Sequence, residues 1–306
     1  MRRFLIAVVA VLAIIVDANA QKTVSHVLEY ESFVNVKVTD DFIVKLVSSD
    51  KYMVRTNVDE RLDDYVKAYV QNGTLNLIVE RKNFPSELKK ALRVKGAPAP
   101  ILEVEISFPS IKSLEMTDNS ILHKSDVIHS DEFALTMSDK ARVDKIFVEC
   151  SSAEVVLAKA AYAEVEARAS EGLFLITSNT SKAIVKQTGK SIKIDAAGSS
   201  NVKATVEVDE IDVLAAGLAD LTFLPGNAAS MKVSAVGSSK LDAESLNISK
   251  ADVIESGTAK CYVNVKDTLK VNLIGNSLLT FKNKPYIDVE RIVGSTLIKS
   301  DDPKRK

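Results

Sequence analysis

The residues that could take part in catalysis are few, and they are scattered along the chain. Asp195 and Asp212 could form a pair of carboxylates on adjacent repeats, which is an arrangement that supports general acid and base chemistry. The alternation of apolar and polar residues around them places both side chains on the solvent side of their strands. Charged side chains are common at such outward positions, so the sequence favours two solvated carboxylates over a catalytic pair.

The histidines and serines add no catalytic centre. His26, His123 and His129 have no Cys, His or carboxylate partner at the sequence spacing of metal ligands, so no zinc site is expected. His123 and His129 are predicted to be exposed turn residues. No serine lies in a nucleophile elbow, and no Gly-Lys-Ser/Thr phosphate loop is present. We therefore assign no catalytic residue, cofactor or metal, and do not expect an enzyme.

Two sets of residues could bind a ligand without catalysis. A row of serines could form a polar ladder, although hydrogen bonding within turns explains these residues without any ligand. The row consists of Ser199, Ser200, Ser238 and Ser239. The absence of Trp counts against a carbohydrate cleft, because sugar faces commonly stack on aromatic rings. Three tyrosines could substitute, namely Tyr69, Tyr162 and Tyr262.

The two cysteines, Cys150 and Cys261, are the only residues that could form a disulfide. An oxidising compartment would allow the bond. The repeat pattern described below places them at different points of different repeats, so two buried free thiols are predicted instead.

The N-terminus indicates export. Arg2 and Arg3 precede an uncharged apolar run at 4–16, which is followed by Ala18-Asn19-Ala20. This pattern is typical of a secretory signal cleaved after Ala20, and it predicts that the chain is exported from the cytoplasm. No later stretch approaches the ~20 apolar residues of a membrane helix. The net charge of −1 gives no electrostatic reason to expect binding to nucleic acid.

The segment at 21–110 is predicted to be rich in strands. Apolar residues alternate with polar ones in short runs from Ser32 to about Phe108, which is the period of a strand with one buried face. Asn72-Gly73 separates two such runs and suits a tight hairpin turn. The stretch at 84–92 predicts one short helix, which ends in the proline-rich stretch at 96–100. We expect this segment to cap one end of the protein.

From Ile111 onward the chain repeats itself. Six glycines mark the repeat, at spacings of 19, 20, 20, 18 and 19 residues: Gly198, Gly217, Gly237, Gly257, Gly275 and Gly294. Apolar residues recur two and four residues before each glycine and four and six residues after it, so inward-facing strands flank every turn. Glu255 interrupts this apolar pattern, and the last repeat slips by one residue near Val289.

Each unit therefore contains a strand, a glycine turn, a second strand and a second turn. A unit of about 19 residues cannot bury its own apolar face, so neighbouring units must stack into a solenoid. Glycine fits the corner of each coil because it accepts positive φ without steric cost. Weaker copies with Asp, Asn or Ser at the corner are found at 114–120, 135–139 and 150–155. The predicted architecture is a signal segment at 1–20, a capping part at 21–110, solenoid coils at 111–300 and a charged tail at 301–306.

These features together resemble a secreted family of Bacteroidetes, the putative autotransporter adhesin head domain or head GIN domain, whose function is unknown. The segments that carry the resemblance are 33–38, 42–46, 73–77, 104–109, 197–200 and 236–239. The similarity covers nearly the whole mature chain and rests on the order and spacing of the segments. It implies a right-handed parallel β-helix and an envelope or extracellular location, in the periplasm or at the surface of a Gram-negative bacterium. Adhesion is the role that the family name suggests.

Three functions remain open from the sequence. The favoured one is a non-enzymatic module that presents an extended surface to a glycan or an envelope protein. A polysaccharide lyase or hydrolase on the same scaffold is the second, and it would need clustered carboxylates or an Asp, Lys and Arg group on neighbouring coils. A periplasmic scaffold or homo-oligomer is the third, because open solenoid ends expose strand edges. The sequence does not identify the ligand.

Overall fold

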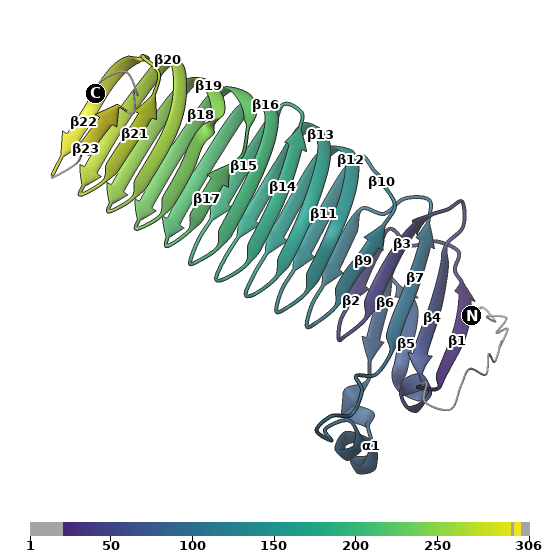
Figure 1. The fold of residues 1–306 in the computed structure, drawn as a ribbon. Coiled ribbons are helices and arrows are strands. Elements are labelled where there is room, and N and C mark those ends of the chain that lie inside the picture. Colours follow the sequence, from purple (N-terminus) through teal and green to yellow (C-terminus); the bar gives the residue numbers. More distant parts are fainter. Residues whose placement is uncertain (1–20, 295–296, 301–306) are drawn as a thin grey trace.

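The protein is an elongated β-solenoid, seen in a computed structural model that describes residues 21–294 and 297–300 (Figure 1). Strands make up 68% of the chain, and the solenoid has about 9 turns of roughly 20 residues each. This architecture confirms the predicted fold class. The predicted signal segment at 1–20 and the charged tail at 301–306 lie outside the described residues. No helix in the described part is long and apolar enough to span a membrane.

The N-terminal region contains the antiparallel strands. β4 (Met53–Asp59) lies between β1 (Thr23–Glu29) and β7 (Leu102–Phe108) and is antiparallel to both. β5 (Val66–Gln71) and β6 (Thr74–Val79) form the hairpin predicted at Asn72-Gly73, whose two turn residues both have positive φ. The predicted short helix is α1 (Ser86–Ala91), and two 3₁₀ helices accompany it, η1 (Glu60–Tyr65) and η2 (Arg81–Asn83).

Aromatic side chains fill the N-terminal end of the solenoid. Phe33 is buried and packs edge-on against Tyr52, with ring centroids 5.0 Å apart. Tyr65 of η1 packs in the same way on Phe84, at 4.9 Å. The hydroxyl of Tyr30 donates a hydrogen bond of 2.9 Å to the carbonyl of Ala68, and burial raises the pKa of this phenol to about 12. These contacts close the apolar core at this end.

Two strands join this region to the coils. β2 (Asn35–Val38) pairs in parallel with β6 on one side and with β8 (Ser113–Met116) on the other. β3 (Ile43–Ser48) pairs in parallel with β7 and with β9 (Ile121–Ser125). The capping region and the coils therefore share one continuous hydrogen-bonded sheet system, which is visible in Figure 1.

Each coil contributes to two sheets, which we call the incoming and outgoing sheets because their strands lead into and out of the glycine corner. The incoming sheet contains β8, β11 (Glu132–Met137), β15 (Ser191–Ala196), β18 (Gly226–Gly237), β22 (Tyr286–Val293) and the second halves of β12 (Arg142–Leu157), β13 (Tyr162–Thr177), β16 (Asn201–Gly217), β19 (Lys240–Gly257) and β20 (Lys260–Gly275). The outgoing sheet contains β9, β14 (Lys182–Thr188), β17 (Asp220–Phe223), β21 (Leu278–Lys282), β23 (Leu297–Ser300) and the first halves of the same long strands. The short β10 (Ile128–His129) pairs with β12.

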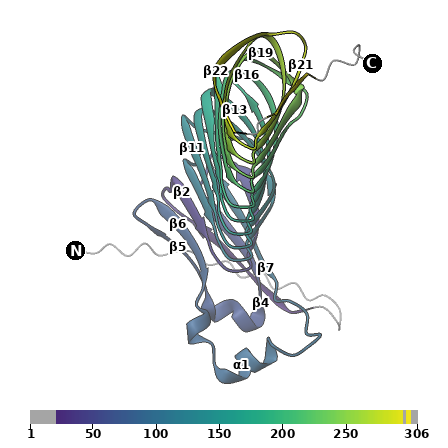
Figure 2. The same cartoon turned by 90° about the vertical axis from the view of Figure 1, so that its left-hand side faces the viewer.

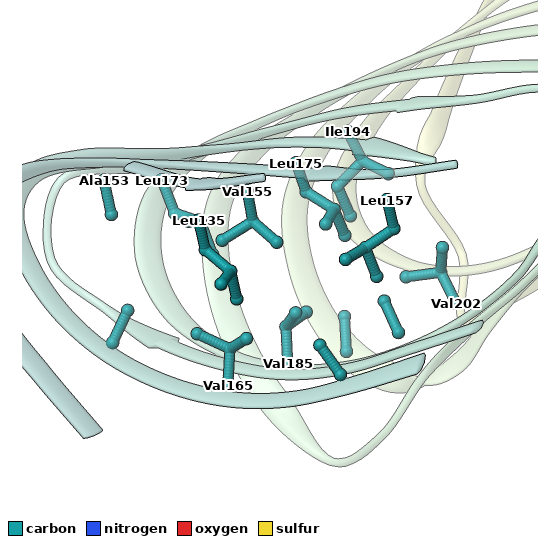
Figure 3. Packing of buried hydrophobic residues seen from close by; sticks show 14 of the residues in the cluster. Leu135, Ala153, Val155, Leu157, Val165, Leu173, Leu175, Val185, Ile194 and Val202 are labelled. Carbon is teal, nitrogen blue, oxygen red and sulfur yellow. The ribbon is translucent and has the colours of Figure 1, made fainter. Parts of the chain in front are cut away.

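The core lies between these two sheets. In Figure 3, Leu135, Val155 and Leu175 of the incoming sheet face Val165 and Val185 of the outgoing sheet, and all five are buried. In Figure 2, which shows the molecule from one end, the coils appear as a staggered series of narrow loops. Along the strands of both sheets, buried inward residues alternate with outward residues that are more exposed to solvent.

The corner between the two sheets is a column of residues with positive φ. The six repeat glycines occupy it, with φ between 73° and 102°. A Cβ atom on Gly257 would lie 2.7 Å from the carbonyl oxygen of Gly237, so stacking as well as φ requires glycine there. Earlier coils place polar residues in the column: Asp40, Asp118, Asp139, Lys159 and Asn179. The copy predicted at 150–155 was misplaced, because this segment leads from the second corner into the incoming sheet and Lys159 holds the positive φ.

Candidate functional site

The two carboxylates considered for catalysis do not form a pair. Asp212 lies beside Lys193 in the strand register, whereas Asp195 lies beside Leu214. Both side chains point outward, as predicted, and the Asp195 carboxylate lies 3.8 Å from the ammonium of Lys193 on the same strand. They belong to different columns of the incoming sheet and carry out no joint chemistry.

Each histidine contacts one carboxylate that sequence spacing did not reveal. His26 lies 2.7 Å from Asp63, and His123 lies 3.0 Å from Asp144. His129 similarly approaches Glu149 at 3.3 Å. His123 and His129 are exposed, but they lie on β9 and β10 rather than in turns, so that part of the prediction was wrong. Within the described residues, no group of three or more His, Cys, Asp or Glu residues could hold a metal ion.

The serine row has a structural role at the corner. Ser200 and Ser239 point inward and are buried, and the Ser239 hydroxyl donates to the carbonyl of Ala215 at 3.2 Å. Ser199 and Ser238 lie outside, where the Ser238 hydroxyl bonds Thr258 of the next coil at 2.8 Å. These hydrogen bonds give the polar groups of the corner partners within the protein.

The tyrosines do not form one aromatic platform. Tyr69 belongs to the N-terminal hairpin, whereas Tyr162 and Tyr262 belong to distant coils of the outgoing sheet. The Arg142 guanidinium lies 4.5 Å from the Tyr162 ring centre, so that ring is covered by a cation.

Both cysteines are free. Cys261 is fully buried, as predicted, but Cys150 is only half-buried because it lies beside the bulge at the second corner. Burial raises the pKa of both thiols, so both are protonated and weakly nucleophilic at neutral pH.

Glu255 is a buried carboxyl in the core of the solenoid. It keeps the inward position of its column, between Ala235 and Leu273 of the neighbouring coils. Neither carboxyl oxygen has a well-formed hydrogen bond, although the Cys261 thiol and the Ser277 hydroxyl are its polar neighbours. Burial raises the pKa of Glu255 to about 7, and the two neighbours offset only part of this effect.

Asparagine side chains form a continuous ladder at the second corner. The Asn227 amide donates to both oxygens of Glu207, at 2.9 and 3.2 Å. Asn247 donates to Asn227 at 3.1 Å, Asn264 donates to Asn247 at 3.4 Å, and Asn283 donates to Asn264 at 2.5 Å. This asparagine ladder lines an open groove of about 440 Å³, together with Ser249 and Lys266.

The ladder leaves hydrogen-bonding capacity free. An amide has two N–H donors and a carbonyl with two lone pairs. Asn247 and Asn264 each use one donor and one lone pair within the ladder. Each can therefore still donate one hydrogen bond and accept one from a ligand in the groove. Equal donor and acceptor capacity on these two neighbouring coils suits hydroxyl groups, which both donate and accept.

A second ladder, made of charges, crosses the incoming sheet. Lysine and aspartate alternate along one column of register partners: Lys193, Asp212, Lys232, Asp252, Lys270 and Asp288. Much of this charge ladder lines a shallow groove of about 570 Å³. Opposite charges on neighbouring strands attract, which explains the alternation within the chain.

The sequence pattern contained a signal for only one of these ladders. The first five members of the charge ladder stand five residues before successive repeat glycines, so aligning the repeats would have revealed them. The asparagines stand 10, 10, 7 and 8 residues after their glycines. Bulges between Ala243 and Lys250 change the residue count of the second corner and hide the ladder from a fixed period.

Comparisons with known proteins agree with this architecture. The chain matches the family model described as putative auto-transporter adhesin, head GIN domain, over residues 32–181 and 169–285. No curated protein sequence gives a match. A crystal structure of a putative adhesin from Parabacteroides distasonis is similar in fold, with 16% identity, a TM-score of 0.53 and coverage of 91% of this chain and 97% of that one.

Two further crystal structures share the fold. A putative lipid binding protein from Parabacteroides distasonis has 14% identity and a TM-score of 0.52, with coverage of 94% of this chain and 99% of that one. A putative adhesin from Parabacteroides merdae has 15% identity and a TM-score of 0.50, with coverage of 92% and 97%. The family and two of these structures are described as putative adhesins, the third structure is described as a putative lipid binding protein, and none is described as an enzyme.

Proposed function

Because the chain belongs to the family of the putative auto-transporter adhesin head GIN domain, we propose that it is an adhesive module of the bacterial envelope whose asparagine ladder binds a hydroxyl-rich polymer such as a glycan. The observation that carries the proposal is the ladder itself. Its asparagines stand on four successive coils, and the inner ones have unused donors and acceptors.

The geometry of the solenoid matches a linear ligand. Coils stack at about 4.8 Å, so the ladder from Glu207 to Asn283 extends for roughly 19 Å along the axis. A polymer that lies along this axis meets a similar polar group at each step. Such a repeated contact gives affinity through many weak hydrogen bonds and needs no deep pocket.

The same family membership and the expected signal at 1–20 support an envelope location. Export of the chain is tested by expressing it with and without residues 1–20 and measuring its amount in the cytoplasmic and periplasmic fractions. Retention of the full-length chain in the cytoplasm would contradict the location.

The binding proposal is tested on a glycan array with residues 21–306, followed by calorimetry with the polymer that binds. The Asn247→Ala/Asn264→Ala variant removes the free amides and should weaken binding at least about tenfold, because each lost hydrogen bond contributes about 1 kcal/mol. Asn201→Ala is the matched control, since Asn201 lies on the outgoing sheet outside the ladder.

Three outcomes would change the assignment. Equal weakening by the control and the ladder variant would place the ligand elsewhere. Turnover of a uronate polymer would identify an enzyme. Absence of binding to every polymer would favour a structural scaffold.

A further inference from the structure

The alternation that stabilises neighbouring strands of one chain also makes the charge ladder of the incoming sheet complementary to its own reversed order. The ladder contains six alternating charges, so its order read backwards has an aspartate wherever the forward order has a lysine. From the geometry of the ladder we infer that the incoming sheet is the interface of a two-fold symmetric dimer of this chain. This inference is independent of the ligand proposed for the asparagine ladder.

A two-fold axis parallel to the strands would bring two incoming sheets face to face. It keeps each column opposite the same column of the second copy and reverses the order of the coils. Lys193 then faces Asp288 of the second copy. Asp212 faces Lys270, and Lys232 faces Asp252. Six opposite-charge contacts form in total, because the symmetry repeats each of these three pairs.

The columns on either side of the charge ladder fit the same axis. One begins with Asp195 and ends with Arg291, and the axis places these two opposite charges against each other. The other contains Glu210 and Lys250, which would face Thr268 and Ser230. The axis thus places no two like charges directly opposite each other in the three columns.

The register is selective. Moving the axis by half a coil would place lysine on lysine and aspartate on aspartate along the whole ladder, and like charges in contact cost several kcal/mol across an interface. Exposed apolar side chains accompany the ladder near the corner, among them Leu214 and Val236. They would be covered in the dimer.

The area is sufficient for a stable dimer. Six coils at about 4.8 Å and eight residues at about 3.3 Å give a face of roughly 29 by 26 Å, or about 750 Å² on each copy. The total of about 1,500 Å² lies in the range of specific interfaces. The reversed coil order also places the two N-terminal capping regions at opposite ends of the dimer.

The test uses residues 21–306 and two single variants, Lys232→Asp and Asp252→Lys. Each variant places two like-charge contacts at the centre of its own homodimer, so the dimer should weaken about 100-fold, with roughly a tenfold effect for each contact. An equimolar mixture of the two variants restores every opposite-charge contact, and it should form the dimer again. Sedimentation velocity measures all three samples, and fluorescent labels on the two variants identify the mixed dimer.

The mixture separates the dimer interface from stability within one chain. In each variant, neighbouring coils of the same chain carry like charges, and mixing the two proteins does not change this. Only contacts between chains are repaired. Lys203→Asp, on the outgoing sheet, is the matched control and should dimerise like the unchanged chain.

Salt provides a further measurement. The dimer should weaken between about 0.05 M and about 0.5 M salt, since screening shortens the range of charge interactions. A chain that stays monomeric at low salt would overturn the inference. So would single variants that dimerise normally, or a mixture that stays monomeric while both variants keep their folded circular dichroism spectra.

Discussion

We expect the solenoid to lose stability as the pH rises from about 5 to about 8, and we expect the Glu255→Gln variant to lose much less. Glu255 is fully buried, and burial raises its pKa from 4.5 to about 7 in the folded protein. In the unfolded chain the carboxyl has its ordinary pKa. Between these two pKa values the folded protein binds one proton more than the unfolded chain. The free energy of unfolding therefore falls with rising pH in this window and stays low above pH 7.

The size of the loss follows from the pKa difference. A shift from 4.5 to about 7 corresponds to about 3 kcal/mol, at 1.4 kcal/mol for each pKa unit. Domains are typically stable by about 5–15 kcal/mol, so this loss is a large fraction of the total. For a chain of this length, with an unfolding entropy of about 0.6 kcal/mol/K, the midpoint of thermal unfolding should drop by about 5 °C.

Thermal unfolding followed by circular dichroism at several pH values measures this drop. Hydrogen exchange identifies the strands that lose stability. Exchange should accelerate with pH beyond its intrinsic dependence mainly in β19 and β20, which hold Glu255 and its neighbour Cys261. Coils of a solenoid contact only their neighbours, so the N-terminal coils should change little. Glu210→Gln, at an exposed position of the same sheet, is the control and should keep the pH dependence of the unchanged chain.

Two results would refute the reasoning. One is a midpoint that stays constant from about pH 5 to about pH 8. The other is an equal loss in Glu255→Gln, which would assign the pH dependence to another group.

Three further predictions concern other positions. Asp59 is buried, and although burial alone would raise its pKa, the hydrogen bonds and charge of Arg61 lower it overall, so its stabilisation is lost as the pH falls. Asp59→Asn should reduce stability by about 2 kcal/mol at pH 7 and by much less in acid, measured by urea unfolding; an equal loss at both pH values would contradict this. Gly257→Ala should destabilise by about 2 kcal/mol or more, and by more than Gly96→Ala, which shares the positive φ but meets no atom within 4 Å. Equal thermal midpoints for the two glycine variants would show that stacking at the corner does not matter. The Cys261 thiol should react with a thiol reagent only on unfolding, whereas the half-buried Cys150 should react in the folded protein; equal rates would be the contrary result.

The coils could be predicted because their sequence constraint is local and periodic. Each repeat glycine has positive φ, and the flanking inward positions are apolar, so the period is visible without coordinates. In the N-terminal region β1 and β4 were missed, since their inward faces include polar residues such as Thr56, which is buried. Pairing with antiparallel neighbours places these strands in the sheet, although the apolar and polar pattern of β1 and β4 does not indicate it.

The binding surfaces depend on contacts that no short motif contains. The His26 and Asp63 pair spans 37 residues, and the asparagine ladder crosses coils whose second corners differ in length. Glu255 shows a related limit, because a charged residue in an apolar column predicts a break, whereas the stacked coils keep it inside. In each case the register between strands decides which side chains meet, and this register is a property of the whole stack.

The position of β2 between β6 and β8 sets an order for folding. Asn35 pairs with Thr74 and with Ser113, which follow it by 39 and 78 residues. Each later coil closes a loop of about 20 residues and pairs with the exposed strands of the coil before it. Closing so short a loop has a small entropic cost, which is the same for every coil. The first coil must close both long loops before a neighbouring coil exists for it to pair with, so we expect the slow step of folding at the N-terminal end. Once it is complete, the remaining coils can be added in sequence toward the C-terminus.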